Sequence, residues 1–232
     1  MRSVKQAGPN TKAVFREQMR GWLKERDFDR LLAAGKPMAV VRALFSLLYF
    51  PDELIHWRAV EALGRAAAAL ADEKPQAGRD ILRRLFWALN DESGGNGRAV
   101  PEAIGAIISR RSALYGDLTS VLLSFLGDPA LRRGILWAAA EIGRAAPGLI
   151  RGAAAAIFPY LADEDPHVRA HAVRALGETG ARPAPKIIAR LQKDEAEAEI
   201  YLDGELKKVR VKELAAGYFG DSGGLPGENG AR

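Results

Sequence analysis

The stretch "DEDPHVRAHAVRALGETG", residues 163–180, has the pattern of a helix that begins at a proline. Asp165 can cap the first turn with its carboxylate, and Pro166 follows at a position where a missing backbone N–H is tolerated. Apolar residues then recur at helical spacing as far as Gly177, close to the end of the stretch. We therefore predict a helix over residues 166–180.

Three other segments contain the same Leu-Gly or Ile-Gly pair near their ends: "IHWRAVEALGRA" from residue 55, "NGRAVPEAIGAI" from residue 96 and "ILWAAAEIGRAA" from residue 135. The four glycines are 41, 38 and 34 residues apart. A period of this length predicts stacked helical hairpins. A glycine inside a helix costs about 1 kcal/mol relative to alanine, so we expect each one to allow the first helix of the same or the next unit to approach closely.

Prolines and short polar segments divide each unit into two amphipathic helices. The predicted first helices cover residues 37–49, 75–90, 115–126 and 147–162. The predicted second helices cover residues 52–71, 98–110, 130–146 and 166–180. Pro159 lies inside one of these ranges, where we expect it to kink the helix or end it early.

The fourth unit resembles the HEAT repeat, and also the short HEAT-like units of the phycobilisome-lyase type. An Asp-Pro-x-Val-Arg turn opens its second helix at Asp165, and Ala-Leu-Gly closes it at Gly177. The other three units share only the Ala-Leu/Ile-Gly half, so the resemblance covers residues 37–193. It implies an all-α fold, a right-handed α-solenoid of helical hairpins whose second helices line a concave face. It also implies that Arg169 and the nearby aspartates bridge repeats and are structural.

The two ends of the chain differ from the repeats. Residues 1–36 predict an N-terminal helical cap with an apolar face. Within residues 194–218, Asp203-Gly204 separates two alternating segments, 199–202 and 205–211, which predicts a β-hairpin followed by a short helix at 212–216. Residues 219–232 have the composition of a flexible tail.

Composition excludes several classes of protein. The chain of 232 residues has no cysteine, so it has no disulfide framework, thiolate zinc site or thiol nucleophile. It lacks a run of eighteen apolar residues, and we expect a cytoplasmic protein without a membrane span. The net charge of +5 is concentrated in the first 50 residues, where ten Lys and Arg face four Asp and Glu.

Aligning the units on their glycines predicts a shallow dip in the concave face. We compared the positions ten, six and three residues before each glycine and one after it, which follow one side of a helix. In the second unit three of these four are Gly or Ala, so we expect a dip centred on residues 95–106, with Trp137 as one wall. We expect Trp22, Trp57 and Trp87 to be core or half-buried. The candidate binding residues lie on this stripe and on the glycine-rich segment beside the dip: Arg58, Glu61, Arg65, Asn90, Asp91, Glu92, Gly94, Gly95, Asn96, Glu102, Trp137, Glu141, Arg144, His171 and Arg174.

Motifs for catalysis and for cofactors are weak. "GGNGRAV" lacks the Gly-Lys-Ser/Thr ending of a phosphate-binding loop. His167 and His171 are four residues apart, but a third metal ligand is missing nearby and Arg174 opposes a cation, so we expect two solvent-facing histidines and no metal. HEAT-like hydroxylases that hold two irons use His-Glu dipeptides, and this chain contains none. We expect no cofactor.

Three functions remain open. The first is a non-catalytic scaffold whose concave face binds another protein, with a partner segment that inserts a side chain into the dip. The second is nucleic-acid binding, as in HEAT-like DNA glycosylases, which the basic composition favours and the glutamates along the same face oppose. The third, by analogy alone, is an accessory protein of the lyase type.

Overall fold

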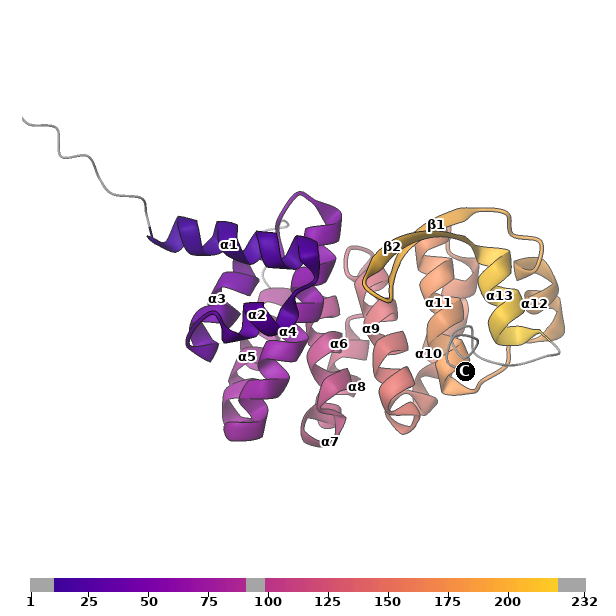
Figure 1. Ribbon diagram of the computed structural model, residues 1–232. Helices are drawn as coiled ribbons and strands as arrows, with labels where there is room; N and C mark the ends of the chain where they lie inside the picture. The colour runs from indigo at the N-terminus through magenta and orange to yellow at the C-terminus, as the bar shows by residue number, and fades with distance from the viewer. Residues whose placement is uncertain (1–10, 91–98, 221–232) are drawn as a thin grey trace, which may run out of the picture.

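The computed structural model describes residues 11–90 and 99–220, and Figure 1 shows its helices stacked along one axis. The α-helices are α1 (Thr11–Glu25), α2 (Phe28–Ala33), α3 (Pro37–Leu47), α4 (Glu53–Glu73), α5 (Pro75–Leu89), α6 (Val100–Arg110), α7 (Ser112–Tyr115), α8 (Thr119–Ser124), α9 (Arg132–Ala145), α10 (Ala154–Ile157), α11 (Pro166–Thr179), α12 (Pro185–Leu191) and α13 (Val211–Phe219). Short 3₁₀ turns are η1 (Gly116–Leu118), η2 (Pro147–Leu149), η3 (Arg151–Ala153) and η4 (Phe158–Ala162). The strands are β1 (Glu197–Leu202) and β2 (Glu205–Arg210).

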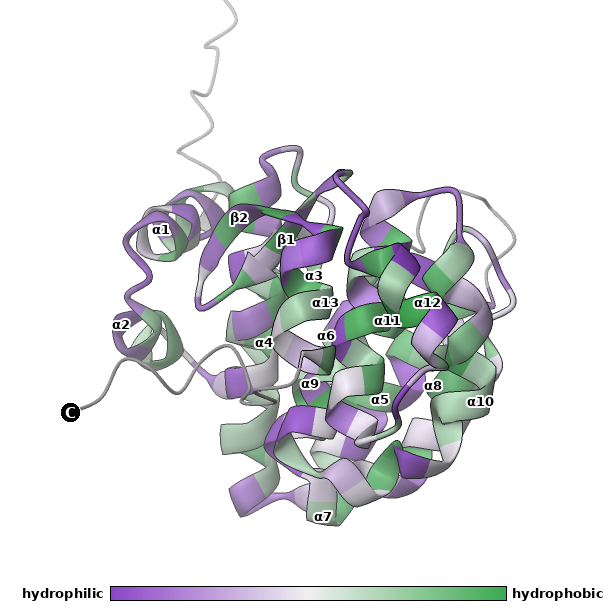
Figure 2. Ribbon diagram, turned by 90° about the vertical axis from the view of Figure 1, so that its right-hand side faces the viewer, coloured by the Kyte–Doolittle hydropathy of each residue, from purple (hydrophilic) through white to green (hydrophobic). Residues whose placement is uncertain are grey.

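The predicted α-solenoid is confirmed. The second helices α4, α6, α9 and α11 pack side by side in chain order, and the first-helix segments cover their other side. Local signals place these helices as expected: the Asp52 and Asp165 carboxylates accept backbone N–H groups of the first turns of α4 and α11. Hydrophobic and hydrophilic residues alternate along the helices, as Figure 2 shows.

Two of the predicted first helices are broken into short pieces. Residues 115–126 form the end of α7, η1 and α8, and residues 147–162 form η2, η3, α10 and η4. Gly148 and Gly152 lower the helix propensity of the second segment. Pro159 lacks a backbone N–H and lies in the first turn of η4, so the helix is interrupted there as predicted.

The repeat glycines lie where consecutive second helices come closest. A Cβ built on Gly64 would lie 2.7 Å from the Ala106 carbonyl oxygen of α6, and one on Gly105 would meet Ala138 of α9. The prediction that a first helix packs against each of these glycines was therefore wrong for Gly64 and Gly105. At Gly143 a Cβ would meet both Ile150, from the next first-helix segment, and Glu178 of α11. The glycines thus bring each second helix against the next one.

The C-terminal helix α13 occupies the place of a further second helix. It packs along α11 and against α12, and its Tyr218 lies where a side chain on Gly177 would have to go. Gly217 of "AAGYF" corresponds to the repeat glycines, and Tyr218 corresponds to the residue that follows each of them. The division of the chain expected at residue 193 stays a prediction, and of the expected tail the structure describes only Phe219 and Gly220.

The predicted β-hairpin is confirmed; in the sequence it follows α12 and precedes α13. Its strands pair antiparallel from Glu197 opposite Arg210 to Leu202 opposite Glu205. Asp203 and Gly204 have φ values of 55° and 88°, which fit the two-residue turn that Asp-Gly favours. At the other end of the molecule, α1 and α2 cover α4, and their buried side chains are Met19, Leu23, Phe28 and Leu31.

The glycine contacts predict a steric effect on stability. In Gly105→Ala the new methyl group would lie 2.6 Å from Ala138 Cα, so we expect the free energy of unfolding to fall by about 1–3 kcal/mol. In the control Gly152→Ala a Cβ meets nothing within 4 Å, and we expect a change between zero and about 1 kcal/mol of stabilisation. Urea unfolding of the three proteins measures both values, and equal stabilities would contradict the packing described.

Candidate functional site

The β-hairpin crosses the second helices and is fastened at its turn by Arg58 of α4. The Arg58 Nε donates to the Gly204 carbonyl at 3.1 Å, and its Nη2 pairs with the Glu205 carboxylate at 2.7 Å. Its Nη1 donates to the carbonyls of Leu23 at 3.1 Å and Lys24 at 2.6 Å, at the end of α1. This one guanidinium therefore joins the N-terminal cap, the first repeat and the hairpin. We call the side of the second helices that the hairpin crosses the inner face.

Three aromatic rings hold the hairpin against the inner face. The Tyr201 ring of β1 stacks on Trp57 with a centroid distance of 5.3 Å and an interplanar angle of 5°. Trp57 also contacts Trp137 of α9 at 5.0 Å, and the Trp137 indole N–H donates to the Tyr201 carbonyl at 3.4 Å. These contacts bury two tryptophans from different repeats under one strand.

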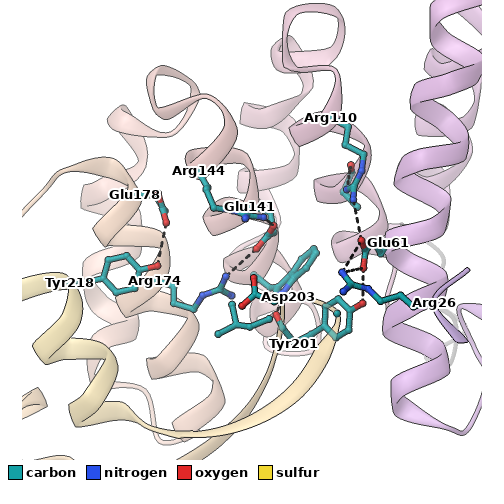
Figure 3. A pocket seen from close by; sticks show the side chains of 14 residues that line it. Arg26, Glu61, Arg110, Glu141, Arg144, Arg174, Glu178, Tyr201, Asp203 and Tyr218 are labelled. Atoms are coloured by element: carbon teal, nitrogen blue, oxygen red, sulfur yellow. Dashed lines mark hydrogen bonds and ion pairs between the residues drawn. The ribbon is translucent and has the colours of Figure 1, made fainter. Parts of the chain in front are cut away.

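A cavity of about 570 Å³ lies on the inner face beside the hairpin turn (Figure 3). Four arginines, four acidic residues and three aromatic rings contribute to its wall. The lining residues are Arg26, Glu61, Ala106, Arg110, Trp137, Glu141, Arg144, Arg174, Glu178, Tyr201, Leu202, Asp203, Gly204 and Tyr218. Ala106, Arg144, Glu178 and Tyr218 each directly follow a glycine of a second helix, so the repeat itself sets these positions.

Glu61 is the centre of one hydrogen-bonded group in the wall. Its carboxylate accepts from the Tyr201 hydroxyl at 2.8 Å, from Arg65 at 3.0 Å and from Arg26 at 3.3 Å. Burial acts to raise the pKa of Glu61, but the hydrogen bonds from Tyr201 and Arg65 and the charges of both arginines outweigh it, so the pKa is lowered. Glu61 is therefore ionised at neutral pH.

Glu141 and Glu178 form the opposite part of the wall. Glu141 pairs with Arg174 at 3.0 Å and also with Arg144. Glu178 accepts from the Tyr218 hydroxyl at 3.2 Å, and burial raises its pKa. The cavity thus presents alternating positive and negative groups, which suits recognition of a polar ligand.

Comparison with known proteins agrees with this architecture. Residues 118–200 match the family model of HEAT repeats. A protein from Archaeoglobus fulgidus, described only as an uncharacterized protein, is 31% identical over 176 residues, which cover 74% of this chain and 91% of that protein. The chain belongs to the HEAT-repeat proteins. HEAT repeats commonly serve as scaffolds for protein interaction, and their stacked units form extended concave binding surfaces.

Five of the predicted site residues of this HEAT-repeat protein line the cavity: Glu61, Trp137, Glu141, Arg144 and Arg174. The cavity also includes Ala106, at the C-terminal end of the predicted dip. Ala99, the first described residue of that range, is 2% exposed and Ala106 is 1% exposed, and Trp137 is covered by the hairpin instead of forming an open wall. In the described part of the predicted dip, residues 99–106 are buried, so the open dip expected there was wrong; residues 95–98 lie outside the described residues.

Three predicted site residues, Arg58, Arg65 and Asn90, do not line this cavity. Arg58 is only 6% exposed, because the hairpin and α1 use its donors, which corrects its expected position on an open face. Arg65 points to Glu61 and lies over the Phe28 ring, outside the cavity. Asn90 ends α5, and its side chain donates to the Phe86 carbonyl at 3.0 Å. The expected contacts Asp91, Glu92, Gly94, Gly95 and Asn96 lie outside the described residues.

Glu102 and His171 are buried instead of facing solvent. The Glu102 carboxylate lies against α9, where a Cβ on Gly134 would be 2.6 Å from its oxygens. His171 is 0% exposed, and burial, with the nearby charge of Arg174, places its pKa well below the usual value. It is neutral, so the expectation of a solvent-facing histidine was wrong for His171, whereas the His167 side chain is 29% exposed. Trp87, expected to be core or half-buried, is 81% exposed on α5.

Sequence reasoning missed the part of the wall that comes from outside the four repeats. Arg26 belongs to the link between α1 and α2, and residues 201–204 to the hairpin. Tyr218 could have been found by extending the glycine alignment to Gly217. Within residues 11–90 and 99–220, no three His, Asp or Glu side chains are grouped to hold a metal ion. Nor does that part of the chain contain a helix long and apolar enough to cross a membrane.

The Arg58 contacts predict a large loss of stability on truncation. Arg58→Ala removes four hydrogen bonds, among them the one to the Gly204 carbonyl of the hairpin turn and the charged pair with Glu205, so we expect the free energy of unfolding to fall by about 3 kcal/mol. The control Arg84→Ala removes an exposed arginine of α5 and should change stability by less than about 0.5 kcal/mol. Urea unfolding measures both changes, and equal effects would show that the Arg58 contacts do not stabilise the fold.

Glu102 predicts a pH dependence. Burial raises its pKa from 4.5 to about 7, although the charge of Arg133 acts in the opposite direction. Between these two pH values the folded protein keeps a proton that the unfolded chain has lost, so stability falls as pH rises through this window. From pH 4.5 to 7 we expect the free energy of unfolding to fall by on the order of 3 kcal/mol more in the native protein than in Glu102→Gln. The contributions of the other titratable groups cancel in this comparison. Unfolding of both proteins across this range measures it, and a constant difference would contradict the assignment.

Proposed function

We propose that this HEAT-repeat protein is a non-catalytic scaffold that binds a segment of a partner protein in the cavity of its inner face. The observation that carries the proposal is the cavity wall itself, in which arginines and carboxylates alternate around aromatic rings from several repeats. A wall of this kind offers hydrogen bonds in both directions to a polar segment. Its volume of about 570 Å³ is in the range of sites that enclose a few side chains.

The chemistry of the cavity supports recognition over catalysis. Glu61 is held ionised by its arginines and by Tyr201, so it is a poor proton donor near neutral pH. Glu141 is shared by two arginines. Nucleic acid is disfavoured, because the carboxylates of Glu61, Glu141, Glu178 and Asp203 face the same cavity and would repel a phosphate backbone.

The test reverses one charge at the edge of the cavity. The Arg144 side chain is well exposed, so Arg144→Glu should leave the fold intact while it repels whatever Arg144 contacts. We expect affinity for a partner purified from the host to fall about tenfold or more, whereas the control Arg84→Glu, on an exposed surface of α5, should bind as the native protein does. Equal affinity of both variants would contradict the cavity as the binding site.

Duplex DNA serves as the competing ligand in the same assay. Binding to a phosphate backbone weakens steeply as salt concentration rises. We expect no such salt-dependent binding. A salt-dependent affinity for DNA that is lost in Arg144→Glu would favour the nucleic-acid function instead.

A further inference from the structure

We infer that the cavity contains a subsite for a carboxylate, formed by the guanidinium groups of Arg110, Arg144 and Arg174. This inference rests on the proposed function and names the group of the partner segment that the cavity takes. All three arginines line the cavity, and they come from three consecutive second helices, α6, α9 and α11. Figure 3 shows Arg144 and Arg174 approaching Glu141 from two sides, with Arg110 on the side of Glu61.

The first observation is that few carboxylates pair directly with these cations, although Glu178 and Asp203 also line the cavity. Arg144 and Arg174 share the single carboxylate of Glu141. The Arg110 guanidinium is 3.8 Å from the Glu61 carboxylate, which is already engaged by two other arginines and by Tyr201. Three guanidinium groups with fifteen N–H donors, five each, therefore have few acceptors in the protein.

The second observation is that Arg174 has an unused donor away from bulk water. The Arg174 side chain is 5% exposed, and its Nη1 is buried without a hydrogen-bond partner among the described residues. The Arg110 side chain is 30% exposed, and its Nη1 reaches the Ala106 carbonyl only at 3.3 Å. Buried polar groups are nearly always satisfied in a protein in its working state, so an acceptor from a ligand is expected here.

Electrostatics favours an added negative charge at Arg110. Burial lowers the pKa of Arg110, the charges of Glu61 and Glu141 only partly oppose this, and the positive charges of Arg65 and Arg144 add to it. An anion beside Arg110 would offset both effects. The geometry suits a planar carboxylate, because a guanidinium can bind it with two parallel hydrogen bonds. A phosphate dianion fits less well, since Glu141 and Glu178 line the same cavity and repel the additional charge.

The test uses three matched probes that differ in the position of one carboxylate. N-acetylglutamine carries only an α-carboxylate, N-acetylglutamic acid 1-amide carries only a side-chain carboxylate, and N-acetylglutaminamide is neutral. The Nε–Hε resonances of the ¹⁵N-arginine-labelled full chain are recorded during titration with each probe. We expect saturable shifts at Arg110, Arg144 or Arg174 with at least one carboxylate probe and none with the neutral probe. The probe that binds more tightly tells whether the natural group is a chain terminus or an acidic side chain.

Variants make the assignment specific. Arg110→Gln should weaken binding of the carboxylate probe at least about tenfold, and the exposed Arg84→Gln should not change it. If Arg110→Gln fails to fold, Arg144→Gln at the edge of the cavity replaces it with the same expectation. No shift with either carboxylate probe, or equal shifts with the neutral one, would overturn the inference. If the probes fail to bind but Arg144→Glu still loses the partner, the carboxylate subsite is refuted and the scaffold proposal stands. If the probes bind but Arg144→Glu captures the partner as well as the native protein does, the scaffold proposal is refuted and the subsite stands.

Discussion

The close approach of consecutive second helices at Gly64, Gly105, Gly143 and Gly177 is the constraint on which the structure depends. A Cβ at any of these positions would collide with the next unit, so each helix can lie directly against its neighbour only because the side chain is missing. The helix-propensity cost of a glycine is about 1 kcal/mol and is offset by the packing that it allows. Because the contact repeats, the residue after each glycine falls on the same face, and those after Gly105, Gly143 and Gly177 form one wall of the cavity.

The hairpin turns this face into an enclosed site. A two-stranded sheet is marginally stable by itself, so its position depends on what it contacts. Arg58 binds its turn, and the stacked rings of Trp57 and Tyr201 hold its first strand. The cost of burying the Arg58 charge is met by four hydrogen bonds, one of them to a carboxylate. The same contacts that stabilise the hairpin also place Tyr201, Asp203 and Gly204 in the cavity wall.

Local signals in the sequence were sufficient for the second helices and for the hairpin turn, but not for the two first helices that are broken into short pieces. Asp165-Pro166 and Asp203-Gly204 act through bonds to neighbours a few residues away, and both were predicted correctly. The contact between Arg58 and Gly204 spans 146 residues, and no local pattern indicates it. His171 and Trp137 were misplaced for that reason: the helical stripe was right, but burial of these side chains depends on the long-range packing of the folded chain. The predicted candidate site therefore held five of the repeat-derived residues of the cavity and lacked Ala106, Arg110 and Glu178 as well as the residues from outside the four repeats.

Amide hydrogen exchange of the hairpin, residues 197–210, tests the central claim most directly. In this account the hairpin is a fixed part of the inner face. Its inter-strand amides should exchange only with the opening of the second helices, at rates similar to those of α4 and α9. Exchange of these amides at rates close to those of an unstructured peptide, while α4 and α9 stay protected, would show that the hairpin is not held on the inner face and that the cavity is not a formed site.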